Sequence, residues 1–162
     1  MVFNGEIYNH LELRTQLEAE GVAPHWRGHS DTETLLAAIE GWGLDSTLGR
    51  LAGMFAFALW DKEQQSMLIA RDRIGKKPLY YYPVADTDNG PGDIIFASEL
   101  KSILQLDQVP RDIRIDALYD FFAYQYVPDP KTIFEGIFKL EPGHYMTIDA
   151  NGIKMDKYWE IS

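Results

Sequence analysis

The residues at the start of the chain could supply part of an active site. Asn4-Gly5-Glu6 places an amide side chain, a glycine and a carboxylate in consecutive positions. A glycine allows a backbone N–H to approach a ligand closely, because no Cβ stands in the way. The chain contains no cysteine, so a thiol that attacked an amide would have to lie outside these 162 residues. We interpret this opening as part of an active site whose nucleophile lies on sequence upstream of Met1.

The Asn4-Gly5 pair also has a structural interpretation. Asn and Gly adopt positive φ at little cost, and between apolar residues such a pair is typical of a tight hairpin turn. Taken alone, the pair favours that turn. The further motifs described below favour the active-site interpretation.

A basic cluster stands in the middle of the chain: Arg71, Arg73, Lys76 and Lys77. It lacks the Gly-x-x-x-x-Gly-Lys-Ser/Thr pattern whose backbone amides cradle phosphate. We therefore predict a turn between two strands, with Arg71 paired to Asp72 or to a nearby acid.

Composition restricts the partners. A chain of 162 residues with an apolar fraction of 46% is one ordinary domain with a packed core. The net charge of −10 argues against nucleic acid and anionic membranes, because both would repel the protein. Without a secretory signal, cysteines or an apolar run of roughly 20 residues, we expect a soluble, cytoplasmic protein with no membrane partner. The histidines are spaced too irregularly for a metal site, and we assign no metal: His10, His25, His29 and His144.

Two helices are expected in the first third of the chain. Asn9 and Glu12 have the spacing of a capping box, which predicts a helix that runs to about Glu20. Ser30 and Glu33 repeat this spacing and predict a second helix with Ser30 as its N-cap. Its apolar residues have the spacing that buries one face: Leu35, Leu36, Ile39 and Trp42.

The middle of the chain has the pattern of strands. Residues 54–60 are all apolar, as in a strand buried on both faces, and a polar connection to 67–70 predicts an antiparallel hairpin. We interpret the tyrosines at 80–82 and the aromatic run at 121–124 as core or interface. The fold class is α+β with a mainly antiparallel sheet. The other expected elements are strands at 79–82, 93–97, 145–148 and 158–159, a turn-rich loop at 86–92, and helices at 98–104 and 115–123.

Several motifs occur in a fixed order along the chain. They are NGEIYN at 4–9, SDTE at 30–33, GMFAFALWD at 53–61, ARDRIGKKPLYY at 70–81 and FASELK at 96–101. In this combination the chain resembles the glutaminase domain of glutamine-hydrolysing asparagine synthetases, which are class II glutamine amidotransferases. The likeness extends from Asn4 to about Trp159.

The resemblance implies a fold and a domain organisation. The fold would be a four-layer αββα sandwich of the N-terminal-nucleophile hydrolase type, truncated at its N-terminus. Residues 1–162 would form one partial glutamine amidotransferase type 2 domain, and residues 143–162 would lead into a synthetase domain. The family's Met-Cys-Gly start, its arginine segment that holds glutamine's carboxylate and its Ser-Gly-Gly-x-Asp-Ser loop for ATP do not occur in this sequence.

The resemblance also implies residue roles. In the family, the N-terminal cysteine attacks the amide, and its own α-amine serves as the base. The Asn side chain and the Gly backbone N–H form the oxyanion hole, which carries over to Asn4 and Gly5. The acids of the two polar motifs surround glutamine's α-amine, which carries over to Glu6 and Asp31. Asp31 also has a structural interpretation, because the helix dipole favours an acid in the first turn. Glu33 we interpret as a cap and not as a ligand.

The implied function is hydrolysis of glutamine to supply ammonia for ATP-dependent amidation of aspartate. ATP and Mg would bind in the synthetase domain, and no cofactor is expected in this one. The partners would be glutamine and the C-terminal synthetase domain, and a homodimer stays open. The 162-residue fragment would be inactive without its cysteine. Two alternatives stay open: a non-catalytic binding or scaffold module of the same fold, and the glutaminase-like domain of another amide-forming synthetase, such as a β-lactam-forming one.

Overall fold

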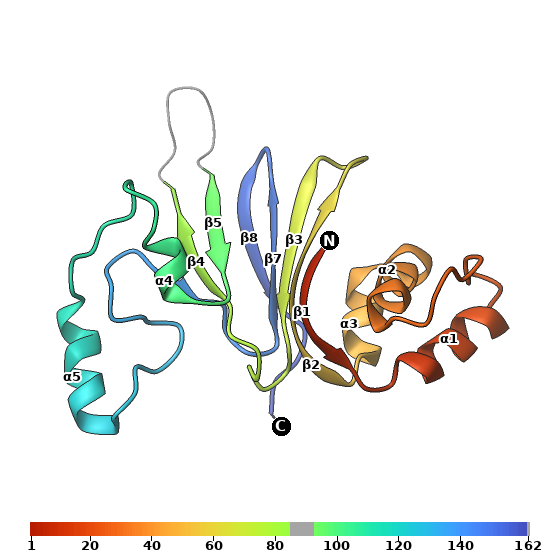
Figure 1. The fold of residues 1–162 in the computed structure, drawn as a ribbon, viewed down its shortest axis with the longest axis horizontal. Coiled ribbons are helices and arrows are strands. Elements are labelled where there is room, and N and C mark those ends of the chain that lie inside the picture. Colours follow the sequence, from red (N-terminus) through yellow and green to blue (C-terminus); the bar gives the residue numbers. More distant parts are fainter. Residues whose placement is uncertain (85–92, 162) are drawn as a thin grey trace.

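The computed structural model describes residues 1–84 and 93–161 (Figure 1). The loop predicted at 86–92 lies outside the described residues. The helices are α1 (His10–Ala19), α2 (Asp31–Trp42), α3 (Leu44–Arg50), α4 (Leu100–Ile103) and α5 (Ile115–Tyr124). None of them combines the length and the apolar character of a membrane span. The strands are β1 (Val2–Ile7), β2 (Gly53–Asp61), β3 (Ser66–Arg71), β4 (Tyr80–Pro83), β5 (Ile94–Ala97), β6 (Phe138–Lys139), β7 (His144–Asp149) and β8 (Gly152–Lys157).

The strands form two antiparallel sheets. The larger sheet has the strand order β1-β2-β3-β7-β8, and the smaller has the order β5-β4-β6. The predicted hairpin is confirmed, because β2 and β3 pair with Ala58 opposite Ile69. On its other side β2 pairs with β1, with Gly5 opposite Phe55. As a result, β1 is an edge strand of the larger sheet and β5 is an edge strand of the smaller one.

The two sheets stack between helical layers. In Figure 1, α1, α2 and α3 lie outside the larger sheet, and α4 and α5 lie outside the smaller sheet. Side chains alternate along β2 as in any strand. Phe55 and Phe57 pack toward α1 to α3, whereas Ala56 and Ala58 pack toward the smaller sheet. The prediction that this strand is buried on both faces is confirmed, as is the four-layer α+β sandwich.

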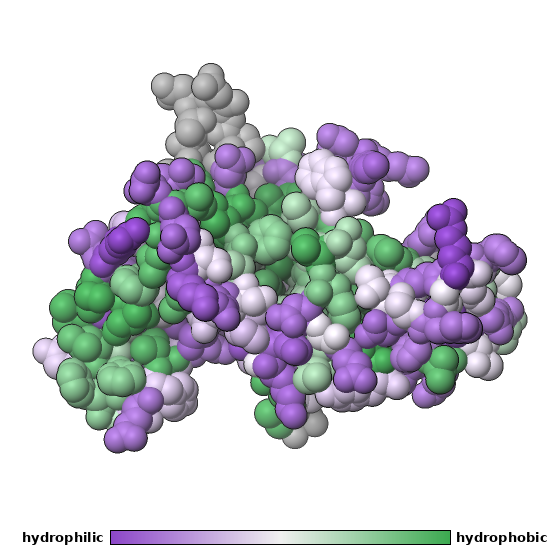
Figure 2. All heavy atoms as spheres, viewed as in Figure 1, coloured by the Kyte–Doolittle hydropathy of each residue, from purple (hydrophilic) through white to green (hydrophobic). Residues whose placement is uncertain are grey.

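The aromatic residues of the second half of the chain divide into core and surface. Tyr81 packs between the sheets, while Tyr80 and Tyr82 pack with α4 on the other face, so these tyrosines belong to the core as predicted. The run at 121–124 does not belong to it. Phe122 is 76% exposed, and Figure 2 shows apolar surface over the α5 end of the molecule.

Two adjacent residues at the end of β3, Arg71 of the basic cluster and Asp72, carry buried charges. Arg71 forms an ion pair with Asp129, with 3.0 Å between guanidinium nitrogen and carboxylate oxygen. The predicted turn between strands is confirmed, but the acid that pairs with Arg71 is Asp129 and not Asp72. The Asp72 carboxylate accepts hydrogen bonds from the backbone N–H groups of Phe55, Ile74, Lys76 and Lys77.

Two local predictions at helix starts have different outcomes. The Ser30 hydroxyl accepts the N–H of Glu33 at 3.2 Å, so the N-cap of α2 is confirmed. The capping box at Asn9 is wrong, because the Asn9 side chain does not cap α1. It bridges the carbonyl of Arg50 and the N–H of Ala52 instead. This tertiary partner outcompetes the local one.

Other corrections concern the extent of elements. Asn4-Gly5 lies inside β1, so the hairpin turn at this pair is wrong. The strand predicted at 158–159 is also wrong, since β8 ends at Lys157. Helix α3 was not predicted, and Leu36 of α2 is 40% exposed and not part of the buried face.

The open edge of β1 predicts self-association of the 162-residue chain. An unpaired strand edge is a template for pairing with another chain, and a lysine on that edge opposes it. We expect light scattering to show a mass that rises with concentration, and Val2→Lys to move this rise to higher concentration. Leu11→Lys is the control. Leu11 is as exposed as Val2, at 64% against 63%, but it lies on α1 and not on the strand edge. A monomeric wild type at all concentrations, without binding of an apolar dye, would contradict the prediction.

Candidate active site

Strand β1 directs alternate backbone N–H groups toward its open edge. The N–H of Tyr8 donates to Ala52 at 2.8 Å, toward β2, whereas the N–H of Ile7 donates to the Asp31 carboxylate at 3.0 Å. Because N–H groups alternate in direction along a strand, the N–H of Gly5 points the same way as that of Ile7. Phe55, opposite Gly5, agrees with this direction, since its own N–H and C=O bond to Asp72 on the far side of β2. Gly5 therefore offers a backbone donor at the edge of the sheet.

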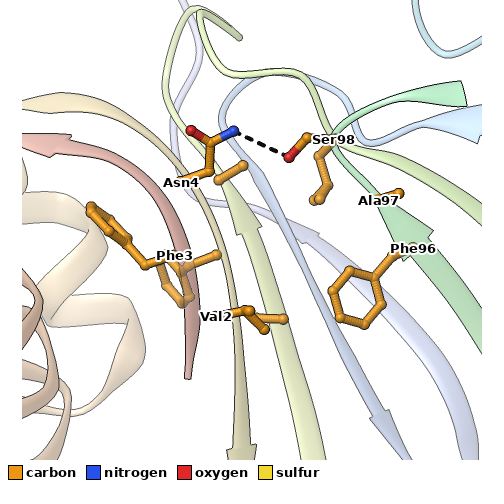
Figure 3. A pocket seen from close by; sticks show the side chains of 10 residues that line it. Val2, Phe3, Asn4, Phe96, Ala97 and Ser98 are labelled. Carbon is orange, nitrogen blue, oxygen red and sulfur yellow. Dashed lines mark hydrogen bonds between the residues drawn. The ribbon is translucent and has the colours of Figure 1, made fainter. Parts of the chain in front are cut away.

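The Asn4 side chain lies beside this donor, on the face of β1 that looks toward the smaller sheet. Its Nδ2 donates to the Ser98 hydroxyl at 3.1 Å (Figure 3). The two residues line a cavity of about 240 Å³ between the sheets, otherwise formed mostly by apolar side chains of β1, β2 and β5. Ser98 follows the last residue of β5 directly. The cavity thus has a polar end at the open edges of both sheets.

Gly5 is required by packing and not by a turn. A Cβ built on it would lie 2.2 Å from the carbonyl oxygen of Met54 and 2.7 Å from the Cα of Phe55. A Cβ on Gly53 would lie 2.3 Å from the carbonyl oxygen of Glu6. Neither glycine has a positive φ. The two glycines let β1 lie close against β2, and this contact fixes the direction of the Gly5 N–H.

The two candidate carboxylates differ in their surroundings. Asp31 is the first residue of α2, and its carboxylate accepts the N–H of Ile7 at 3.0 Å and that of Thr32 at 2.8 Å. Glu6 is exposed, on the same face of β1 as Asn4. Within the described part of the chain, the Glu6 carboxylate has no hydrogen-bond or ion-pair partner. The structure therefore brings Asp31 to the β1 edge at Ile7, two residues from Gly5, and leaves the Glu6 carboxylate, on the same strand, without a partner among the described residues.

Glu33 has a different structural role from the predicted cap. Its carboxylate accepts the N–H groups of Arg27 and Gly28 and pairs with Arg14 at 3.2 Å. The hydrogen bond from the Arg27 backbone lowers the pKa of Glu33, and Gly28 and Arg14 act in the same direction. Glu33 anchors the segment before α2. In residues 1–84 and 93–161, no three His, Asp or Glu side chains are grouped to hold a metal ion.

Ser98 is the residue of this site that the sequence interpretation missed. It stands in the FASELK motif, but nothing local marks it as a partner of a residue 94 positions earlier. The available signal was its place directly after a predicted strand, where side chains gather at the end of a sheet.

The fold and this edge site define a class of protein. The chain belongs to the glutamine amidotransferase domain family, whose family pattern matches residues 1–159. It is 41% identical over 154 residues to the glutamine-hydrolysing asparagine synthetase 1 of Bacillus subtilis, and the match covers 94% of this chain and 22% of the synthetase. It is also 35% identical over 161 residues to a Penicillium rubens protein named Amidase chyE, covering 99% of this chain and 22% of that protein. The chain thus spans about a fifth of the length of these relatives.

A solved structure supports the assignment of the fold. The glutamine phosphoribosylpyrophosphate amidotransferase of B. subtilis is similar with a TM-score of 0.60 and 24% identity, over 98% of this chain and 28% of that one. The sandwich predicted from the sequence, of the N-terminal-nucleophile hydrolase type, is confirmed.

The close contact of β1 with β2 predicts that Gly5→Ala destabilises the protein. The added Cβ must push the Met54 carbonyl away, and overpacking of this kind costs roughly 1–3 kcal/mol. Gly49→Ala is the matched control. Gly49 lies in α3, and a Cβ built on it would meet no atom within 4 Å. The control should be neutral or raise stability by about 0.5–1 kcal/mol. Urea unfolding of both variants measures the difference, and equal midpoints would show that the contact is not needed.

Proposed function

We propose that the chain is the glutaminase part of a longer glutamine-hydrolysing asparagine synthetase. The observation that carries this proposal is the edge of β1, where the Asn4 amide and the outward Gly5 N–H lie next to each other and near the Asp31 carboxylate. Its support from relatives is the 41% identity to an asparagine synthetase over nearly the whole chain. On this proposal, residues 1–162 form one partial glutaminase domain, and residues 143–162 lead toward the rest of the protein.

In the proposed reaction, a cysteine thiolate from outside these residues attacks the side-chain amide carbon of glutamine. The electron pair of the C=O bond moves to the oxygen, and Asn4 Nδ2–H and Gly5 N–H donate to this oxyanion. The C=O bond then re-forms as the C–N bond breaks, and the nitrogen leaves as ammonia with the proton that the cysteine's α-amine took from the thiol. Water hydrolyses the thioester and releases glutamate.

The two carboxylates would hold the α-ammonium group of glutamine. An ionised carboxylate has about four lone-pair positions. Asp31 uses some of them for the N–H groups of Ile7 and Thr32, which fixes its orientation and leaves others for an ammonium group. Glu6 supplies a second negative charge on the same strand as the oxyanion donors. Opposite charge makes this pair a fitting site for a cation.

The remainder of the proposed reaction belongs to residues that this chain does not contain. A synthetase domain would bind ATP and Mg, activate aspartate and receive the ammonia, and the whole protein could be a homodimer. The relatives have the length for such a domain, because this chain covers only 22% of them. The similarity to a protein named as an amidase keeps a second candidate, the glutaminase-like domain of another amide-forming enzyme. The acceptor that the full-length protein amidates separates the two.

The proposal predicts that the isolated 162-residue chain does not hydrolyse glutamine, because it contains no thiol. Ammonia release from glutamine by the purified chain should equal the buffer background. Turnover that disappears when one of its Ser or Thr residues is replaced would overturn the cysteine mechanism. It would also favour a different nucleophile within this chain.

Asn4→Ala in the full-length protein should lower kcat for glutamine hydrolysis by roughly 10²- to 10³-fold, the usual loss for one oxyanion donor. Synthesis from free ammonia should survive, since it bypasses this site. Asn151→Ala, at the exposed turn between β7 and β8, is the control and should leave both activities unchanged. Equal loss of both activities in Asn4→Ala would make Asn4 a structural residue.

Asp31→Asn separates a ligand role from a helix-start role. The amide keeps one acceptor for a backbone N–H but loses the charge, so we expect glutamine KM to rise about tenfold, with a stability loss of about 1 kcal/mol. Glu33→Gln removes a charge from the same turn of α2 and should lower stability similarly without changing KM. Steady-state kinetics and thermal melts measure the two effects. An unchanged KM in Asp31→Asn would leave Asp31 with its structural role alone.

A further inference from the structure

We propose that Ser98 is a positioning residue, which anchors the Asn4 side-chain amide at the polar end of the cavity, where its second N–H can reach the oxyanion. This inference rests on the proposed glutaminase function and adds a residue from the second sheet to it. The observation is the hydrogen bond from Asn4 Nδ2 to the Ser98 hydroxyl, at 3.1 Å, across the cavity between β1 and β5 (Figure 3).

The chemistry of a side-chain amide makes such a partner useful. The amide carries two N–H donors on one end and a carbonyl on the other, so a half-turn about its last bond replaces the donors by an acceptor. A carbonyl facing the developing negative charge would repel it. In the structure, the Ser98 hydroxyl accepts one of the two N–H groups of Asn4, so the nitrogen end lies toward β5 and the second N–H is left for the oxyanion.

Ser98 is itself held firmly. The residue before it, Ala97, pairs with Tyr80 of β4 and packs against the cluster around Ile103. Two residues later, Leu100 begins α4 and packs against the same cluster. The hydroxyl is therefore attached to the core of the smaller sheet, whereas Asn4 belongs to the larger one. The hydrogen bond therefore ties the Asn4 side chain to the core of the other sheet.

A purely structural role would make a different prediction. The bond is exposed, and a single neutral hydrogen bond contributes little to folding. Removing it should thus leave the melting temperature nearly unchanged. A positioning role instead appears in kcat, because the oxyanion exists only after the amide has been attacked.

The first test uses the 162-residue chain and needs no activity. In ¹⁵N-labelled protein, we expect nuclear Overhauser contacts between the Asn4 side-chain amide protons and the Ser98 Hβ protons. Ser98→Ala should shift the Asn4 side-chain amide resonances, while Ser102→Ala, on the exposed side of α4, should not. Asn4 resonances that are the same in all three proteins would overturn the inference whatever the protein catalyses.

The second test uses the full-length protein and separates kcat from KM. Ser98→Ala should lower kcat for glutamine hydrolysis roughly three- to tenfold with little change in KM, the size expected of one hydrogen bond. Ser98→Thr keeps the hydroxyl and should restore kcat, and Ser102→Ala should match the wild type. Unchanged kcat in Ser98→Ala, or a loss that follows the melting temperature, would overturn the positioning role. A wild type that does not hydrolyse glutamine would overturn the proposed function, and the spectra would still decide whether Ser98 orients Asn4.

Discussion

Two adjacent buried charges, Arg71 and Asp72, set the relation between the two sheets. Asp72 is fully buried at the end of β3, and its carboxylate holds the N–H of Phe55 in β2 together with N–H groups of the turn that leads to β4. Arg71 reaches Asp129 and the carbonyl of Leu140, which follows β6. Leaving a buried hydrogen-bonding group without its partner costs about 1–3 kcal/mol, and more for a charged group. The cavity between the sheets, and the distance across it, depend on this junction.

The glycines of the first two strands connect this framework to the chemistry. Gly5 and Gly53 each lie where a Cβ would collide with the backbone of the other strand, so β1 can approach β2 closely. With this register fixed, the alternation of backbone direction along β1 decides which N–H groups face away from β2. The N–H groups of Ile7 and Gly5 share that direction, and the Asp31 carboxylate accepts the N–H of Ile7. One structural requirement therefore sets the direction of both the Gly5 N–H and the Ile7 N–H that Asp31 accepts, so a loss of activity in Gly5 variants has to be separated from a loss of stability.

The elements that could be predicted from the sequence are those governed by nearby residues. The Ser30 cap, the buried β2 strand and the hairpin to β3 follow from spacing of a few positions, and all are confirmed. Where a distant partner competes, local patterns fail. The Asn9 side chain does not cap α1 but accepts the N–H of Ala52, more than 40 residues away. The Asn4-Gly5 pair lies in a strand because β2 pairs with it. The Asn4–Ser98 bond spans 94 residues, and no local rule reveals it.

The candidate site is therefore shared between two sheets that are joined by long-range contacts. Asn4 and Gly5 come from the edge of the larger sheet, while Ser98 comes from the end of β5 in the smaller sheet. Ser98 stands two residues before Leu100, which lines a second, mostly apolar cavity of about 520 Å³ together with Phe121 of α5. The position of the hydroxyl that Asn4 contacts is consequently set by the packing of α4, on the helical side of the smaller sheet. The Asn4–Ser98 hydrogen bond thus connects the edge strand of the larger sheet to the packed helical side of the smaller sheet.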